Sequence, residues 1–190
     1  MPVWVWVLIA AVVVIAVVAI VVGRSVGSRK RTEHLKERFG PEYERTVGET
    51  GEQRAAEKEL LEREKNRQKL DIVALSPTAR EEYSHHWRTV QTAFVDNPSG
   101  ALGDADRLVT QVMRERGYPI DAFDQQAADI SVDHPEVVEN YRAGHSIYLS
   151  QEYGGVGTEE QRQAFVHYRA LFEKLLETDN NTDHSQEARA

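Results

Sequence analysis

Residues 76–98, SPTAREEYSHHWRTVQTAFVDNP, decide the fold class, because they contain one whole helix with both ends marked. Ser76-Pro77 is typical of a helix start, with serine as the N-cap and proline in the first turn. Between the ends, apolar side chains recur at helical spacing: Ala79, Tyr83, Trp87, Val90 and Phe94. Asn97-Pro98 repeats the start signal, so a second helix follows at once.

Capped helices of this kind continue to residue 177. Gly117 ends the second helix, and Asp121 can cap a shorter third one. Asp133 or His134 can cap the fourth, with Pro135 in its first turn. Thr158 and Gln161 form a capping-box pair for the last. The apolar positions of these helices are Leu102, Leu108, Val109, Val112, Met113, Phe123, Ala127, Ile130, Val137, Val138, Tyr141, Tyr148, Leu149, Phe165, Tyr168, Phe172, Leu175 and Leu176.

No segment alternates apolar and polar residues with the period of a strand. We therefore predict an all-α protein in which residues 76–177 form a bundle of about five helices. From Thr178 to the last residue the chain is polar, and we expect a disordered tail over 178–190.

A long apolar stretch lies at the other end of the chain. Val3–Val22 contains no charged side chain, and 20 residues of helix extend about 30 Å, the thickness of a bilayer's hydrocarbon core. Trp4 and Trp6 lie where an interfacial aromatic belt would sit. We predict one N-terminal transmembrane helix over residues 3–22. A cleaved signal peptide is disfavoured, because no basic residue precedes this long stretch.

Basic residues follow the apolar stretch directly. Arg24, Arg29, Lys30 and Arg31 predict that this side stays in the cytoplasm, so the N-terminus faces out and the soluble part faces in. The expected location is the cell membrane, with these cations at the membrane interface. An exported domain, held on the outer face or released, is the alternative topology.

Residues 24–75 are highly charged. Leu35, Phe39, Tyr43 and Val47 form a thin apolar stripe, interrupted at Gly40-Pro41, where one helix ends and another begins. The helix expected from about Glu52 to Lys69 has few apolar positions. We therefore predict a charged helical stalk that acts as a solvated spacer.

Charge and cysteine content exclude several function classes. Residues 24–75 carry a net charge of +2, whereas residues 76–177 carry −8. Phosphate backbones would repel so acidic a bundle, so we expect no nucleic-acid partner. The chain contains no cysteine, which excludes disulfides, thiolate metal sites and cysteine nucleophiles.

No sequence motif requires catalysis. The spacings of zinc proteases, serine hydrolases, EF-hands and kinases are missing, so we expect no catalytic residue, cofactor or metal. His85 and His86 are adjacent and point about 100° apart on a helix, which prevents them from sharing one ion. His145 falls on an apolar stripe, where a buried neutral histidine is the simple interpretation.

An alternative function rests on the same histidine. A ligand-contacting or switching His145, together with Tyr141 and Trp87, would line a small-molecule pocket of a sensor or an enzyme. A non-enzymatic, membrane-tethered interaction module is the favoured hypothesis. Its expected partners are the lipid bilayer and another protein, and its oligomeric state stays open. Tyr118 and Tyr153, beside glycine turns, are the first candidates for exposed contact residues.

Two phrases resemble those of an uncharacterised bacterial family. They are Arg38–Tyr43, RFGPEY, and Asp129–Arg142, DISVDHPEVVENYR. Members of that family are similar to this chain over most of its length, with an N-terminal span followed by a charged helical region. The resemblance implies the same topology for this chain, but it implies no activity, cofactor or site residue.

Overall fold

The computed structural model describes residues 28–177, and every regular element in this range is an α-helix. The helix that ends at Phe39 covers residues 28–39 and is called the 28–39 helix below. The others are α2 (Pro41–Thr50), α3 (Gln53–Arg67), α4 (Pro77–Asp96), α5 (Pro98–Arg116), α6 (Phe123–Asp133), α7 (Val138–Glu152) and α8 (Thr158–Leu176). The prediction of an all-α fold is confirmed, and the five helices α4 to α8 lie within residues 76–177.

Local signals set several helix ends as predicted. The Oγ atom of Ser76 accepts a hydrogen bond from the Ala79 N–H (3.1 Å), and the Oδ1 atom of Asn97 accepts one from the Gly100 N–H (3.0 Å). Gly117 ends α5 in the left-handed conformation, with φ at 95°. Glycine adopts this conformation without the Cβ clash that other residues meet.

Three helix starts differ from the prediction. The N-cap of α6 is Ala122 rather than Asp121, and no side chain caps this helix. The fourth helix of the bundle, α7, begins at Val138, because residues after His134 first form a turn in which the Val137 N–H donates to the His134 carbonyl (3.1 Å). The N-cap of α8 is Gly157 rather than Thr158. The Gly157 N–H donates to Oε2 of Glu160 (2.8 Å), which is the hydrogen bond from the N-cap backbone to the N3 side chain in a capping box. This bond lies one residue earlier in the chain than predicted.

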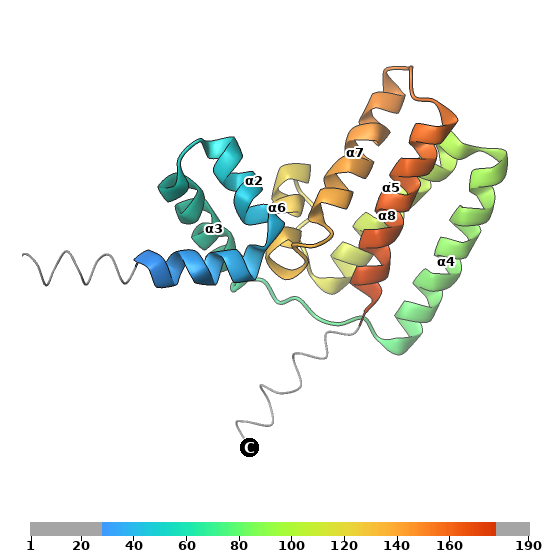
Figure 1. Ribbon diagram of the computed structural model, residues 1–190. Coiled ribbons are helices and arrows are strands. Elements are labelled where there is room, and N and C mark those ends of the chain that lie inside the picture. The colour runs from blue at the N-terminus through green and yellow to red at the C-terminus, as the bar shows by residue number, and fades with distance from the viewer. Residues whose placement is uncertain (1–27, 178–190) are drawn as a thin grey trace, which may run out of the picture.

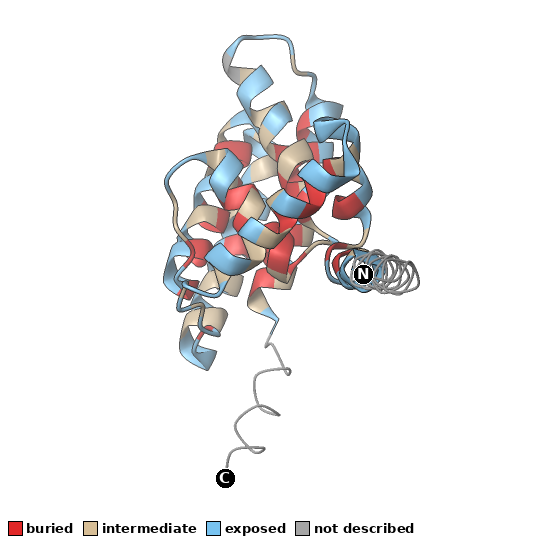
Figure 2. Ribbon diagram, turned by 90° about the vertical axis from the view of Figure 1, so that its left-hand side faces the viewer, coloured by how far each residue is buried: buried red, intermediate tan, exposed pale blue. Residues whose placement is uncertain are grey.

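Two helical hairpins form the bundle. α4 packs against α5 and α7 packs against α8, while α5 and α8 join the two pairs (Figure 1). Residues coloured as buried gather toward the middle of the bundle (Figure 2). The fully buried core residues of α5 and α8 include Leu102, Val109, Val112, Met113, Tyr168, Leu171 and Leu175.

The N-terminal unit, defined here as residues 28–67, is packed rather than solvated. Leu35, Phe39, Tyr43 and Leu60 are buried together with Val132 of α6. The predicted spacer is therefore wrong for this segment, although its helices are present. The reason lies in α3, whose buried residues are Ala56, Glu57 and Leu60. A charged residue on the buried face hides the apolar periodicity from the sequence.

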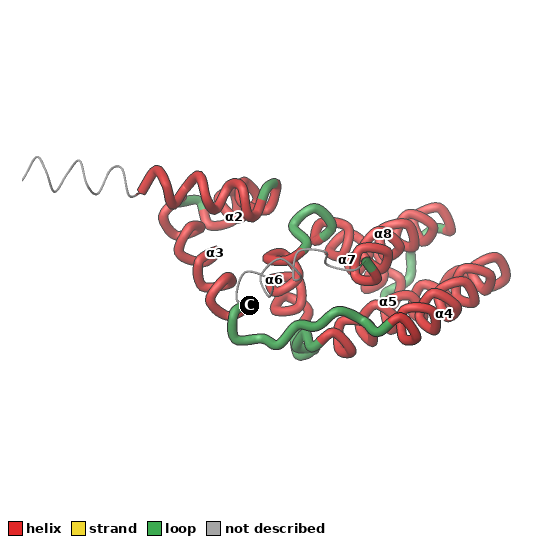
Figure 3. The backbone as a smooth tube through the Cα atoms, turned by 90° about the horizontal axis from the view of Figure 1, so that it is seen from below, coloured by secondary structure: helices red, strands yellow, loops and turns green. Residues whose placement is uncertain are grey.

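The linker of residues 68–76 joins the N-terminal unit to α4 along one side of the molecule (Figure 3). The buried side chain of Arg116 holds it: Nε donates to the Val73 carbonyl (3.2 Å) and Nη1 donates to the Leu175 carbonyl (3.0 Å). The Val73 N–H donates back to the Arg116 carbonyl (2.9 Å). The positive charge thus lies at the C-terminal end of α8, where a helix favours cations.

Several predictions fall outside the described residues. The span Val3–Val22 with Trp4 and Trp6, the cation Arg24, and the tail 178–190 all lie there. Within residues 28–177, no helix combines the length and the apolar character that crossing a membrane requires.

Candidate functional site

Trp87 of α4 lies against the aromatic side chains of α8. Its ring stacks on Phe165 (centroids 4.9 Å apart) and on Phe172 (4.6 Å). Only 6% of the residue is exposed. Stacked rings of this kind contribute about 0.5–1.5 kcal/mol each beyond their buried area, so Trp87 fixes the position of α4 on the bundle.

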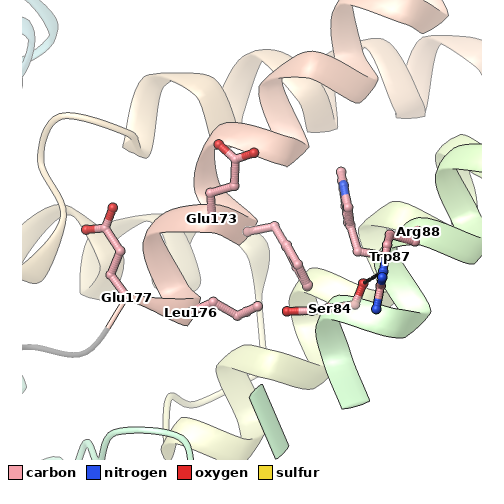
Figure 4. Close-up of a pocket in the computed structure, with 7 residues that line it drawn as sticks. Ser84, Trp87, Arg88, Glu173, Leu176 and Glu177 are labelled. Atoms are coloured by element: carbon pink, nitrogen blue, oxygen red, sulfur yellow. Dashed lines mark hydrogen bonds between the residues drawn. The ribbon is translucent and has the colours of Figure 1, made fainter. Parts of the chain in front are cut away.

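A surface groove of about 350 Å³ lies beside this stack (Figure 4). Its apolar lining comes from Trp87 of α4 and from Phe172 and Leu176 of α8. Leu176 points from α8 toward Ser84 on α4. The groove is large enough for one or two bulky apolar side chains of a binding partner.

Charged residues line the same groove. Arg88 lies on α4, where its Nε donates to the Ser84 carbonyl (3.4 Å), and Glu173 and Glu177 lie on the side of α8. Glu173 and Glu177 each also pair with a nearby cation, Arg169 (3.8 Å) and Lys174 (2.8 Å), so the acidic character of the lining rests on the net charge of −8 in residues 76–177. Such a lining favours a partner segment with apolar and basic side chains.

His145 occupies a different cluster. Its ring stacks on Phe123 with the centroids 3.8 Å apart and the planes 8° from parallel. Its Nδ1 lies 3.3 Å from Oδ1 of Asp106, which also accepts a hydrogen bond from the Tyr168 hydroxyl (2.7 Å). One carboxylate of α5 thus connects α7 with α8.

Tyr141 is buried beside this cluster. Its hydroxyl donates to Oε1 of Gln126 (2.6 Å), and its ring meets the Tyr168 ring edge-on (6.4 Å). Burial raises the pKa of Tyr141 and of Tyr168, and the negative charge of Asp106 raises both further. Both phenols therefore remain protonated hydrogen-bond donors at neutral pH, which suits a structural role.

The structure brings His145 and Tyr141 close together but gives Trp87 other neighbours. The aromatic ring that covers His145 belongs to Phe123, and the groove at Trp87 is lined by α4 and α8. The groove at Trp87 is not lined by His145 or Tyr141, so a ligand site shared by these three residues stays a prediction. What the residues around His145 provide is a packed, hydrogen-bonded contact between helices.

The two tyrosines beside glycine turns have opposite environments. Tyr118 is only 3% exposed, and its hydroxyl donates to Oδ2 of Asp133 (2.7 Å), so the expectation that it forms an exposed contact is wrong. Tyr153 is 88% exposed at the end of α7. Burial raises the pKa of Tyr118, and the charge of Asp133 raises it further.

Sequence reasoning missed the buried ion pairs. Glu42 of α2 is fully buried, accepts a hydrogen bond from Nη1 of Arg63 (2.6 Å), and accepts two from Arg142 (2.7 and 2.8 Å). Burial alone would raise the pKa of Glu42, but the two guanidinium groups hold it below its usual value. These residues lie on three helices, so no local pattern relates them.

Three of the basic residues predicted for the membrane interface, Arg29, Lys30 and Arg31, are exposed in the first turn of the 28–39 helix. His85 and His86 are exposed on α4, and no three potential metal ligands gather anywhere in residues 28–177.

No family model, curated protein or solved structure matches the chain. The resemblance to an uncharacterised bacterial family therefore stays a prediction.

Proposed function

We propose that this protein is a single-pass membrane-tethered interaction module without catalytic activity, which binds a partner protein through the groove beside Trp87. The tether is the apolar segment Val3–Val22, and the helical bundle works on the cytoplasmic side. The apolar length of that segment and the cations Arg24, Arg29, Lys30 and Arg31 after it support this topology.

The groove is the observation that carries the proposal. The half-buried side chain of Leu176 leaves apolar surface at the bundle's exterior, beside the buried Phe172 and Trp87, which are stacked on each other. Interfaces are anchored by bulky apolar side chains in preformed depressions, because little conformational entropy is lost when such a site is filled.

The partner segment should carry a bulky apolar side chain flanked by lysine or arginine. The carboxylates of Glu173 and Glu177 lie on one side of the groove, and the surrounding bundle is acidic. Opposite charges would speed association and exclude acidic competitors.

Photo-crosslinking in intact membranes tests the proposal. A photoreactive amino acid replaces Ser84 in the groove or, as a matched control on the same helix, the exposed Gln91. We expect a discrete crosslinked protein from position 84 and none from position 91. The change Leu176→Arg, which puts positive charge into the groove, should abolish the crosslink. Equal products from both positions, or no product from position 84, would contradict this function.

A further inference from the structure

Five cations of the N-terminal unit form no ion pair among the described residues; four of them lie in the first turn of a helix, and the fifth, Lys65, lies in the last turn of α3. Arg29, Lys30 and Arg31 in the 28–39 helix and Arg54 in α3 are all exposed. Within the part of the chain that the structure describes, none of the four takes part in an ion pair. Arg162 of α8, by contrast, pairs with Glu159 (2.7 Å).

Two side-chain contacts between the 28–39 helix and α3 place Arg54 near the other three first-turn cations. The Thr32 hydroxyl donates to Glu57 (2.6 Å), and further along both helices Nε2 of His34 lies 3.1 Å from Glu64. The 28–39 helix and α3 therefore run in the same direction, and both begin at the same end of the molecule (Figure 1). Arg54 lies about one turn, roughly 5 Å, before Glu57, and so reaches the level of the first described turn of the 28–39 helix.

This end of the molecule is the one farthest from the acidic bundle. The first turns of the 28–39 helix and of α3 lie on the side of the N-terminal unit that faces away from helices α4, α5, α7 and α8 (Figure 1). Residues 76–177 carry a net charge of −8, whereas residues 24–75 carry +2. Charge is thus separated along the molecule, with four of the five cations that form no ion pair at one end.

We propose that the basic end, defined as Arg29, Lys30, Arg31 and Arg54, rests on an anionic lipid surface. This inference rests on the proposed membrane tether, because the segment Val3–Val22 precedes the 28–39 helix in the chain and would bring its first turn to the membrane. Cations within about 10 Å of an anionic leaflet are attracted to it before salt screens them.

Arg54 adds something that the juxtamembrane cations cannot supply. A single helix leaving the membrane can tilt and rotate, but a second contact from α3 fixes the orientation of the whole N-terminal unit. The same lipid charge repels the bundle. The groove beside Trp87 would then be held away from the membrane, where a cytoplasmic partner can reach it.

Site-specific labelling of the full chain tests the inference, since the absence of cysteine allows a single one to be introduced. The variants Ala55→Cys, beside Arg54 on α3, and Gln91→Cys, on α4, carry a fluorophore at exposed positions. Each is reconstituted into vesicles of phosphatidylcholine alone or with phosphatidylserine, with a quencher attached to the lipid headgroups. Flotation of the vesicles reports the tether independently.

We expect headgroup quenching at position 55 only in vesicles with phosphatidylserine, and its loss at high salt. Arg54→Glu should abolish it without weakening α3, because an acidic residue suits the first turn of a helix. Arg162→Glu, a matched change near the start of α8, should leave it intact. Position 91 should stay unquenched throughout. A chain that floats with the vesicles but shows no lipid-dependent quenching at position 55 overturns this inference alone. A chain that does not float overturns the tether.

Discussion

Glu42 and Arg142 lie 100 residues apart in the sequence and are joined by two charge-assisted hydrogen bonds of 2.7 and 2.8 Å. The carboxylate is fully buried between α2 and α7, and Arg63 of α3 holds it from the third side. Two guanidinium groups therefore hydrogen-bond to one carboxylate where the N-terminal unit meets the bundle, and a third, that of Arg45, lies 3.8 Å from it. Loss of the shared carboxylate would leave the largely buried guanidinium groups of Arg63 and Arg142 only the half-exposed carboxylates of Glu59 and Glu139 as partners.

Replacing Glu42 should destabilise the whole chain. We expect Glu42→Ala to lower the free energy of unfolding by about 3 kcal/mol, because Arg63 and Arg142 would face each other without the carboxylate. Urea unfolding followed by helical circular dichroism in mild detergent measures this. Glu44→Ala on the same helix removes an exposed carboxylate and should cost less than about 0.5 kcal/mol. Similar losses for both variants would show that the buried pair is not special.

The contribution of Glu42 should depend on pH. Because its pKa in the folded protein is below the usual 4.5, its stabilising effect is complete above pH 4.5 and disappears as the pH falls through the folded-state pKa. The stability difference between the wild type and Glu42→Gln should therefore be constant from pH 6 to 7 and shrink in acid. Parallel stability curves down to about pH 2 would contradict this assignment.

Asp129 should be a site where stability can be gained. It is 1% exposed, and its Oδ1 accepts from Gln125 (2.9 Å) whereas Oδ2 is buried without a hydrogen-bond partner among the described residues. Burial raises the pKa of Asp129, and the charge of Asp133 raises it further, so the ionised form costs stability at neutral pH. We expect Asp129→Asn to raise the free energy of unfolding by about 1 kcal/mol at pH 7.

The pH dependence of the stability gained in Asp129→Asn tests this prediction. The gain should vanish as the pH falls below 3.8, where the wild-type carboxyl is protonated in both states. Asp124→Asn, an exposed change in the first turn of α6, should bring no gain. A loss of stability in Asp129→Asn at pH 7 would mean that its charge is favourably paired.

Two glycine substitutions should have opposite effects. Gly117→Ala meets both a φ of 95° and the Asp71 carbonyl oxygen, which would lie 2.4 Å from the new Cβ, so we expect a loss of more than about 1 kcal/mol. Gly48→Ala lies inside α2 with open space around it and should gain about 0.5–1 kcal/mol. Thermal unfolding of the two variants in parallel distinguishes these outcomes, and equal shifts would contradict them.

The sequence predicts the bundle because its signals are local. Ser76, Asn97 and Gly117 each act on residues within one helical turn, so their roles can be recognised without knowing the fold. Trp87 is likewise recognisable as a helix-face aromatic. Its neighbours Phe165 and Phe172, however, follow only from how α4 packs on α8.

The N-terminal unit escaped prediction for a physical reason. A buried helix face is recognised by apolar residues, yet here Glu42 and Glu57 lie in the interior and are paired with distant partners. Each charged residue looks solvent-exposed until its partner is known. The same reasoning explains why His145 suggested a pocket, since only the structure shows Phe123 stacked over its ring.

The most direct measurement is fractionation of cells that express the full chain. We expect the protein to sediment with membranes and to resist extraction by alkaline carbonate. The matched variant Val13→Arg/Val17→Arg places two charges in the apolar stretch, at about 2.5–3.5 kcal/mol each, and should move the protein to the soluble fraction. Wild-type protein that stays in the supernatant after high-speed centrifugation would contradict a membrane-tethered module.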